Sequence, residues 1–283
     1  MAKISISNEN ISKSFYAVVK KIVTILYKFL LSFTVSDDII AIVNLKRRWT
    51  TMEITQLKVS FEFEKNPAAD MAYRLYSCLI SRIDREYGEY LHSQEALAVS
   101  HYLDRSGNWT VSLFGEEARR QLLPAFDEKR FNLRLGGFAE IKSIDIHQCE
   151  KIIGIGGNSK CHKFRFISPT AFKSVKRYRN FPTEELIAKS IIQKWRRGEE
   201  RLISDELADR IASGIEISGY RLESTAFTLK TVNIPSFVGE VTITSHLDGM
   251  ENRIWNSLAD FANYSGIGIK TSLGMGGVKV EGL

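Results

Sequence analysis

Apolar and polar residues alternate in one short stretch, which predicts the first strand of the folded part of the chain. Between residues 53 and 63, apolar side chains occupy alternate positions: Leu57, Val59, Phe61 and Phe63. A period of two residues is that of a strand with one buried face. From Ala68 to about Ile83 the apolar spacing becomes helical, and the helical pattern continues to His92.

The rest of the first half predicts a small α/β unit. Its predicted elements, in chain order, are a strand at 109–114, a helix at 116–126, and two strands at 131–135 and 138–146 joined by a glycine turn. The resulting order is β-α-β-α-β-β, with a possible further strand. This order resembles the ferredoxin-like split βαβ unit.

The second half repeats this plan. Its predicted elements, in chain order, are strands at 141–155 and 162–167, helices at 183–195 and 204–213, strands at 220–232 and 237–245, a helix at 251–263 and a strand at 278–280. Residues 233–235 are expected to join the two long strands. The sequence therefore predicts an α+β fold of two tandem ferredoxin-like domains, at 52–141 and 142–283, that ends with a glycine-rich loop.

Residues 1–51 do not fit this plan and are interpreted as an N-terminal extension. Phe15 to Val35 is an apolar run long enough to span a bilayer. Three lysines interrupt it: Lys20, Lys21 and Lys28. Each lysine costs about 2.5–3.5 kcal/mol near the membrane centre, so we expect no stable membrane association. Two interpretations remain, a basic amphipathic helix that packs on a surface and an extension outside the fold.

The composition is that of a globular protein with a modest basic excess. Of 283 residues, 44% are apolar and 25% are charged, and the formal net charge is +6. This charge favours an anionic partner without separating RNA from a membrane surface. Two basic clusters surround an aromatic residue, one at 173–179 around Tyr178 and one at 194–201 around Trp195. The second cluster is more typical of a solvated helix face.

Cysteine and histidine usage predicts neither a disulfide framework nor a metal site. The three cysteines, Cys78, Cys149 and Cys161, form no CxxC pair, which favours a reduced, cytoplasmic compartment. His162 adjoins Cys161, but no second ligand pair stands at zinc spacing. We therefore expect no metal and no cofactor.

The last twenty residues carry the densest motif. Five glycines stand within twelve positions: Gly266, Gly268, Gly274, Gly276 and Gly277. Lys270, Thr271 and Ser272 lie among them, and exposed backbone N–H groups with a lysine and hydroxyls suit a phosphate backbone. The spacing fits neither the GxxxxGK[ST] loop nor a dinucleotide fingerprint. The alternative is a glycine-rich turn without a ligand.

Three segments in order carry a resemblance to a known family: FISPTAF at 166–172, FVGEVT at 237–242 and GIGIKTSLGMGGV at 266–278. They resemble the CRISPR-associated endoribonucleases that process precursor CRISPR RNA, members of the repeat-associated mysterious protein (RAMP) superfamily, whose hallmark is a C-terminal glycine-rich loop. The resemblance covers Met52 to Leu283. It implies two ferredoxin-like domains and metal-independent cleavage of repeat RNA that leaves a 2′,3′-cyclic phosphate and a 5′-hydroxyl.

The resemblance also implies the partners. CRISPR repeat RNA is the expected substrate, and proteins of an effector complex are possible further partners. The alternative function is a non-catalytic RNA-binding subunit of the same superfamily that holds guide RNA. A membrane-attached protein anchored through Phe15 to Val35 is a third, weaker hypothesis.

Metal-free RNA cleavage needs a base for the 2′-hydroxyl proton, an acid for the leaving 5′-oxygen and a cation for the phosphorane charge. Histidine suits the acid–base role because its ordinary pKa is about 6.5. His92 ends the segment YGEYLH, which is similar to the family's first-domain motif, and is the first choice. Tyr76 lies about one residue from the position of a family tyrosine that positions or deprotonates the 2′-hydroxyl, with Tyr73 as a rival. The alternative for both tyrosines is a plain core aromatic residue.

One departure from the family concerns the cation. The family often places a lysine a few residues after the histidine, and this chain has no lysine between His92 and Arg105. His101 or Arg105 is the expected replacement, unless the cation comes from elsewhere. The three remaining histidines are expected to be structural: His147, His162 and His246.

RNA contacts are expected from two segments. The first combines positive charge with a stacking ring: Lys173, Lys176, Arg177, Tyr178 and Arg179. The second is the glycine loop, with Gly266, Gly268, Lys270, Thr271, Gly274, Gly276 and Gly277. The alternative for the first segment is a mobile loop without RNA contact. We expect the glycine loop to hold the RNA and the cut to lie in the first domain, at His92.

Overall fold

The computed structural model describes residues 51–283 except 68–69, 94–96, 134–136, 155, 199–202 and 230–231. The described residues belong to one compact unit. Apart from Thr51, the predicted N-terminal extension lies outside them, and so does the apolar run from Phe15 to Val35. Among the described helices, none has the length and apolar character needed to cross a membrane.

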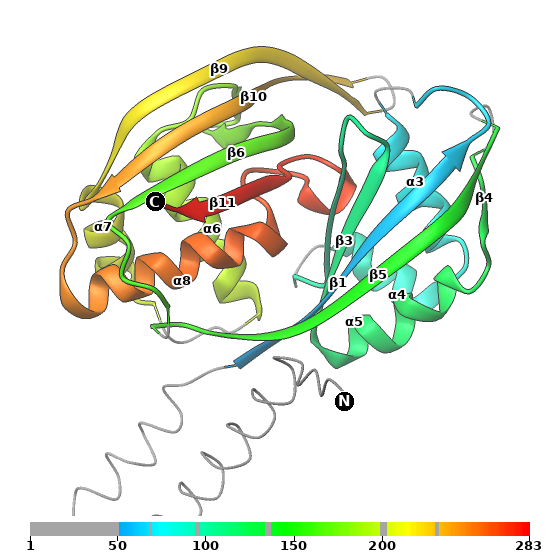
Figure 1. Ribbon diagram of the computed structural model, residues 1–283, viewed down its shortest axis with the longest axis horizontal. Coiled ribbons are helices and arrows are strands. Elements are labelled where there is room, and N and C mark those ends of the chain that lie inside the picture. Colours follow the sequence, from blue (N-terminus) through cyan, green and yellow to red (C-terminus); the bar gives the residue numbers. More distant parts are fainter. Residues whose placement is uncertain are drawn as a thin grey trace, which may run out of the picture. The chain divides into compact units, whose positions relative to one another are not determined.

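The first half is a five-stranded sheet in the order β2-β3-β1-β5-β4 (Figure 1). Its strands are β1 (Thr51–Phe63), β2 (Val99–Leu103), β3 (Asn108–Phe114), β4 (Arg130–Asn132) and β5 (Phe138–Ile152). All neighbouring pairs are antiparallel. Helices α3 (Met71–Ile80) and α4 (Arg85–Ser93) connect β1 to β2. Helix α5 (Gly115–Leu122) and the 3₁₀ turn η1 (Leu123–Phe126) follow β3.

The second half is a four-stranded sheet in the order β11-β6-β10-β9. Its strands are β6 (Cys161–Thr170), β9 (Ile215–Leu229), β10 (Val232–Ser245) and β11 (Val278–Gly282). Helices α6 (Glu184–Gly198) and α7 (Asp205–Ser213) connect β6 to β9. Helix α8 (Gly249–Ser265) and the 3₁₀ turn η3 (Thr271–Leu273) connect β10 to β11.

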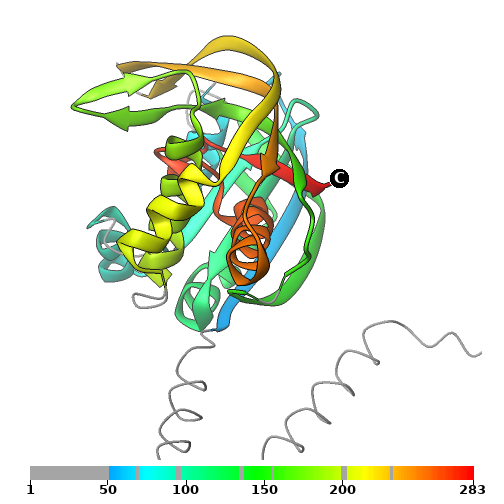
Figure 2. The same cartoon turned by 90° about the vertical axis from the view of Figure 1, so that its left-hand side faces the viewer.

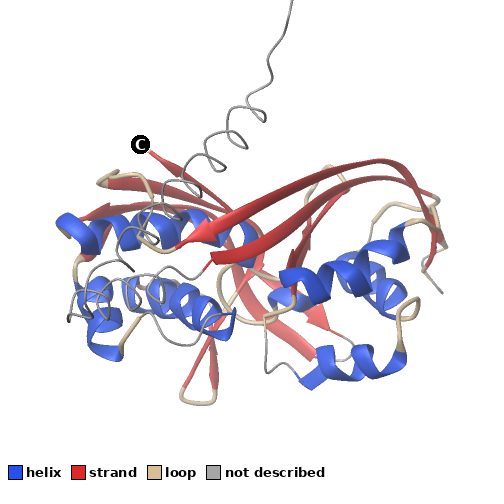
Figure 3. Ribbon diagram, turned by 90° about the horizontal axis from the view of Figure 1, so that it is seen from below, coloured by secondary structure: helices blue, strands red, loops and turns tan. Residues whose placement is uncertain are grey.

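The two sheets share one topology. If β4 is set aside, each sheet has four strands. Numbered by their order in the chain, these strands lie side by side in the order fourth, first, third, second, and helices follow the first and the third strands. This is the ferredoxin-like arrangement. Figure 3 shows the helices gathered on one side of the strands. The predicted α+β fold of two tandem ferredoxin-like units is confirmed.

One insertion distinguishes the second half. The short strands β7 (Phe172–Ser174) and β8 (Arg177–Arg179) form a separate two-stranded sheet between β6 and α6. Val175 and Lys176 make the turn, and both have positive φ, as a two-residue type I′ hairpin requires. The hairpin projects from the body of the protein on the helix side (Figures 2 and 3).

Buried aromatic residues organise both cores. In the first half Trp109 is fully buried, and its ring lies 6.2 Å from Phe61 and 5.9 Å from Phe131. In the second half Trp195 and Trp255 are fully buried under the sheet. The alternation seen in the sequence of β1 is present, because Leu57 and Val59 are buried and Lys58 is exposed.

The structure differs from the predicted elements in two connections. β9 extends to Leu229 and β10 begins at Val232, so the expected linker at 233–235 is part of β10, where Pro235 pairs with Ala226. Proline is tolerated there because β10 pairs with β6 only from Phe237 onward, so Pro235 needs no second hydrogen-bonded neighbour. The expected boundary between residues 141 and 142 falls inside β5, which stays paired with β1 to Ile152.

Candidate nucleic-acid interface

The glycine loop, residues 266–277, is held by hydrogen bonds from two elements of the second half. The N–H of Gly268 donates to Oγ of Ser190 on α6 at 2.7 Å. The N–H groups of Gly276 and Gly277 donate to β6, at 3.0 and 2.8 Å. The N–H of Gly266 closes the last turn of α8 on the carbonyl of Ala262. Most glycine N–H groups of the loop are therefore occupied within the protein.

Close packing explains why these positions are glycines. A Cβ on Gly276 would collide with the carbonyl of Ile267, and one on Gly277 would collide with the ring of Tyr102. A Cβ on Gly274 would lie 2.6 Å from Cβ of Ala72 on α3. The prediction that these glycines present N–H groups to phosphate is thus corrected for four glycines whose N–H groups bond internally, Gly266, Gly268, Gly276 and Gly277, and for Gly274, which is buried against α3.

His101 joins the loop to the first sheet. Nε1–H of Trp109 donates to Nδ1 of His101 at 3.1 Å, so the ring proton lies on Nε2, which donates to the carbonyl of Ser272 at 3.0 Å. The imidazole is 1% exposed, and burial lowers the pKa of His101 to about 3. Both ring nitrogens are occupied, so the prediction of His101 as a catalytic group is replaced by a structural role.

Tyr76 also belongs to the core. Its ring stacks on His101 with the centroids 4.9 Å apart, and the side chain is 3% exposed. Burial raises the pKa of Tyr76, which keeps the phenol protonated and unsuited to act as a base. The rival Tyr73 packs against a small cluster that includes Met275 of the glycine loop. The structure thus brings Tyr76 and His101 together, but as packing partners.

A cavity of about 310 Å³ opens beside the loop and is lined from both halves. The first half contributes Leu91 of α4 and the segment 97–99 that leads into β2. The second half contributes the hairpin, α6 and the segment 268–272 of the loop. These residues are Lys173, Tyr178, Ser190, Gln193, Lys194, Arg197, Gly268, Ile269, Lys270, Thr271 and Ser272.

The lining of this cavity is basic. Its basic side chains are those of Lys173, Lys194, Arg197 and Lys270, and none of the described lining residues is acidic. Lys173 and Tyr178 face each other across the hairpin, and Tyr178 is 40% exposed. The other predicted RNA-binding residues of the hairpin, Lys176, Arg177 and Arg179, are exposed on it outside the lining. The hairpin and Lys270 thus combine charge and an aromatic ring at one opening.

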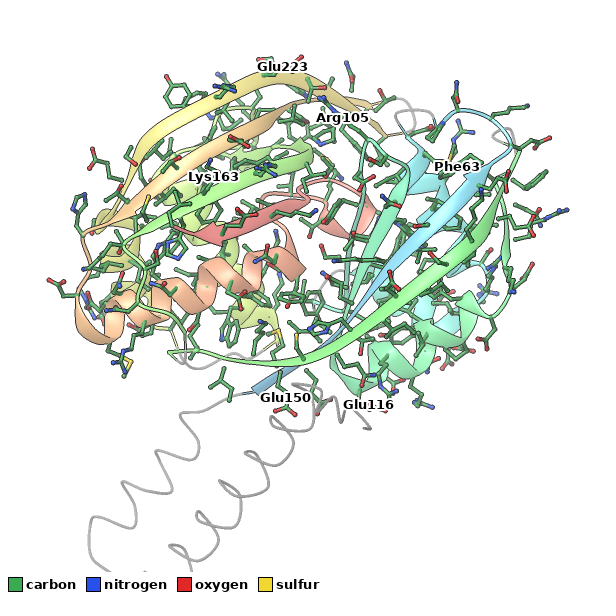
Figure 4. The ribbon with its side chains drawn as sticks, viewed as in Figure 1. Phe63, Arg105, Glu116, Glu150, Lys163 and Glu223 are labelled. Carbon is green, nitrogen blue, oxygen red and sulfur yellow. The ribbon has the colours of Figure 1, made fainter. Side chains whose placement is uncertain are left out.

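His92 lies next to this cavity in the chain. It is exposed in the last turn of α4, and its neighbour Leu91 lines the cavity. Arg105, labelled in Figure 4, lies in the turn beyond the other end of β2, whose first residue Val99 lines the cavity. Strand rise puts about 13 Å between the two ends of β2, so Arg105 is poorly placed to supply the cation.

The remaining histidines occupy other surroundings. His162 is buried against Trp255 and Phe164, and burial lowers its pKa. His246 is exposed and pairs with Glu216 at 2.9 Å, and His147 is exposed on β5. Within the part of the chain that the structure describes, no three His, Cys, Asp or Glu side chains cluster to hold a metal ion.

Sequence reasoning missed the contribution of α6. It assigned the cluster around Trp195 to a solvated helix face, whereas Lys194 is 6% exposed and Trp195 is fully buried. The missed signal is the spacing of Ser190, Lys194 and Arg197. Positions i, i+4 and i+7 share one face of a helix, and this face lines the cavity.

Comparisons with a family model, with curated proteins and with solved structures all match proteins of one description. The family model described as "CRISPR-associated endoribonuclease Cas6" matches residues 164–278. Curated proteins of that description are 29% identical over 237 residues in Streptococcus thermophilus (79% of this chain, 98% of that protein) and 28% identical over 244 residues in Mycobacterium tuberculosis (80% and 77%). A solved Cas6 product complex superposes with a TM-score of 0.66 at 22% identity, covering 82% of this chain and all of that one.

Proposed function

The chain belongs to the Cas6 family of CRISPR-associated endoribonucleases, and on this premise we propose that it cuts precursor CRISPR RNA within its repeats. The single observation that carries the proposal is the cavity between the two ferredoxin-like halves, which is lined by cations without a carboxylate among the described residues. Such a surface suits the phosphates of RNA. The three free cysteines, Cys78, Cys149 and Cys161, fit action in the reducing cytoplasm.

The RNA backbone would lie over the opening of this cavity. Lys173 and Lys270 supply positive charge at the hairpin and the loop, and the ring of Tyr178 is exposed enough to stack on an unpaired base. Gly268 and Thr271 line the same cavity. The contact surface of the loop is therefore the segment 268–272, while its remaining glycines hold the segment in place.

Cleavage would need no metal. The 2′-oxygen of the RNA attacks the adjacent phosphorus and gives up its proton to a base, and the bond from phosphorus to the 5′-oxygen breaks as that oxygen takes a proton. The products are a 2′,3′-cyclic phosphate and a 5′-hydroxyl. His92 is the residue we propose for proton transfer, because its imidazole is exposed at the end of α4 beside the cavity. Arg197 and Lys270 are the proposed cations for the phosphorane charge.

One experiment tests this function. Labelled repeat RNA is incubated with the protein in EDTA, and the products are resolved for a cyclic phosphate end. We expect His92→Ala to slow single-turnover cleavage by 10²-fold or more with nearly unchanged RNA affinity. His246→Ala is the matched control, since it removes another exposed imidazole and should leave the rate unchanged. An equal rate in the His92 variant would exclude His92 from the chemistry.

The alternative, RNA binding without cleavage, is favoured by one observation. Two of the three residues predicted to be catalytic, Tyr76 and His101, are buried and committed to packing. A protein that binds repeat RNA tightly in the same assay and leaves it intact would be a guide-RNA-binding subunit, a possible component of an effector complex.

A further inference from the structure

Lys194 is a buried lysine at the edge of the candidate RNA site. It is 6% exposed, it lines the cavity, and its Nζ donates to the carbonyl of Gly266 at 2.9 Å. Ser190, one helical turn earlier on α6, accepts from Gly268. Helix α6 therefore holds the first part of the glycine loop at two points, and Lys194 both contacts that loop and lines the cavity.

The surroundings of Lys194 are unfavourable for a positive charge. Arg197 lies on the same helix, Lys173 and Tyr178 reach the cavity from the hairpin, and Lys270 reaches it from the loop. The first half contributes Leu91 and 97–99, which carry no charge. Burial, followed by repulsion from Arg197, holds the pKa of Lys194 well below its ordinary value. No carboxylate of the described lining residues offsets this effect.

Given the RNA-binding function proposed above, we propose that Lys194 takes up a proton when an RNA phosphate enters the cavity, so that the ammonium which holds this phosphate is formed only in the complex. An anion beside Nζ favours the charged form of the lysine. The proton comes from solvent, and it converts the neutral amine, which already donates to Gly266, into an ammonium with a further N–H for a phosphate oxygen.

This coupling has a definite sign. When binding takes up a proton, affinity falls as pH rises, by up to tenfold per pH unit for one full proton. The loss of affinity begins as pH rises above the pKa of Lys194 in the free protein, and it ends above the pKa that Lys194 acquires in the complex. Lys173 and Lys270 are less buried than Lys194, and they should add salt-dependent affinity without proton uptake.

Calorimetry measures the proton directly. A 2′-O-methylated repeat RNA, which lacks the attacking hydroxyl, is titrated at pH 8.0 into the His92→Ala protein in Tris and in HEPES. The two buffers differ in ionisation enthalpy, so the difference in observed binding enthalpy gives the protons taken up. Four proteins are compared, all in the His92→Ala background: no further change, Lys194→Met, Lys194→Arg and Lys270→Met.

We expect proton uptake in the parent and in Lys270→Met, and none in Lys194→Met or Lys194→Arg. The arginine variant keeps the charge at all pH values, so its affinity should not fall with rising pH as that of the parent does. Thermal unfolding of each variant verifies that it is folded. Two outcomes would overturn the inference and leave the proposed function standing. Either the parent binds RNA with the same observed binding enthalpy in both buffers, or both Lys194 variants still take up a proton when they bind RNA. An absence of RNA binding would refute both.

Discussion

The imidazole of His101, in the first sheet, donates a hydrogen bond from Nε2 to the carbonyl of Ser272, in the glycine loop of the second half, over 3.0 Å. Trp109 occupies the other ring nitrogen, and Tyr76 covers the ring. One side chain thus fixes the tip of the loop to the sheet of the other half. A histidine that sequence reasoning placed in the chemistry instead maintains the shape of the proposed RNA-binding surface.

Replacing His101 should therefore destabilise the protein. His101→Ala leaves the indole N–H of Trp109 without its acceptor and opens a cavity under Tyr76. Loss of buried hydrogen bonds and packing of this kind costs about 2–5 kcal/mol in the free energy of unfolding, measurable by urea denaturation. His147→Ala, at an exposed position of β5, is the control and should change it by less than about 0.5 kcal/mol. Equal stability of the two variants would contradict the structural role.

The same residue predicts loss of stability in acid. The folded protein holds the pKa of His101 at about 3, whereas in the unfolded chain an ordinary histidine titrates near 6.5. The unfolded state thus binds the proton first, and this contribution to stability is complete above pH 6.5 and lost as pH falls towards 3. From pH 6.5 to 5 the loss should be about 1.5–2 kcal/mol.

The control for this acid effect is His101→Gln. Between pH 6.5 and 5 its free energy of unfolding should fall less than that of the wild type, and the difference should equal the contribution of His101. His162, whose pKa is also lowered by burial, acts in the same direction and is present in both proteins. Parallel pH profiles of the wild type and His101→Gln would show that His101 does not titrate on unfolding.

Glycine packing predicts a contrast between two alanine substitutions. Gly276 and Gly249 both have positive φ, 72° and 52°, but a Cβ on Gly276 meets the Ile267 carbonyl, while one on Gly249 meets nothing within 4 Å. Gly249→Ala should cost only the backbone strain, about 1 kcal/mol. Gly276→Ala should cost about 2–4 kcal/mol, because the loop must also move. Similar thermal midpoints for the two variants would mean that the loop tolerates this displacement.

The basic lining predicts a change in salt dependence. If Lys173 contacts one phosphate, Lys173→Ala should reduce the slope of log affinity against log salt by about 0.7–0.9. Lys142→Ala removes the same charge from β5, where Lys142 pairs with Glu62, and should leave the slope unchanged. Filter binding between 50 and 300 mM salt distinguishes them. A slope that changes equally in both variants would indicate an effect of net charge alone.

The sequence patterns were sufficient for most of the fold, and the reasons for the failures are physical. Apolar and polar residues alternate in β1 because one of its faces is solvated. In β2, Val99 to Tyr102 are all buried, including the polar residues Ser100 and His101. The sequence of β2 therefore shows no alternation, and this strand was not predicted. Lys173 and Lys270, which the sequence predicts to bind RNA, both line the cavity, and their RNA contacts stay a prediction. Lys194 was missed because its burial depends on the loop that packs over α6, a contact 72 residues away in the chain.

The β7–β8 hairpin makes the two halves of the protein different from each other. The two halves share one topology, and a pair of identical halves would accept a bound strand equally well in either direction. Among the described residues, a hairpin between the first strand and the first helix is present in the second half alone. An RNA strand runs from 5′ to 3′ and would meet the hairpin on one side and α4 on the other. It would therefore be seated in a single orientation, which is what cutting every repeat at the same phosphate requires.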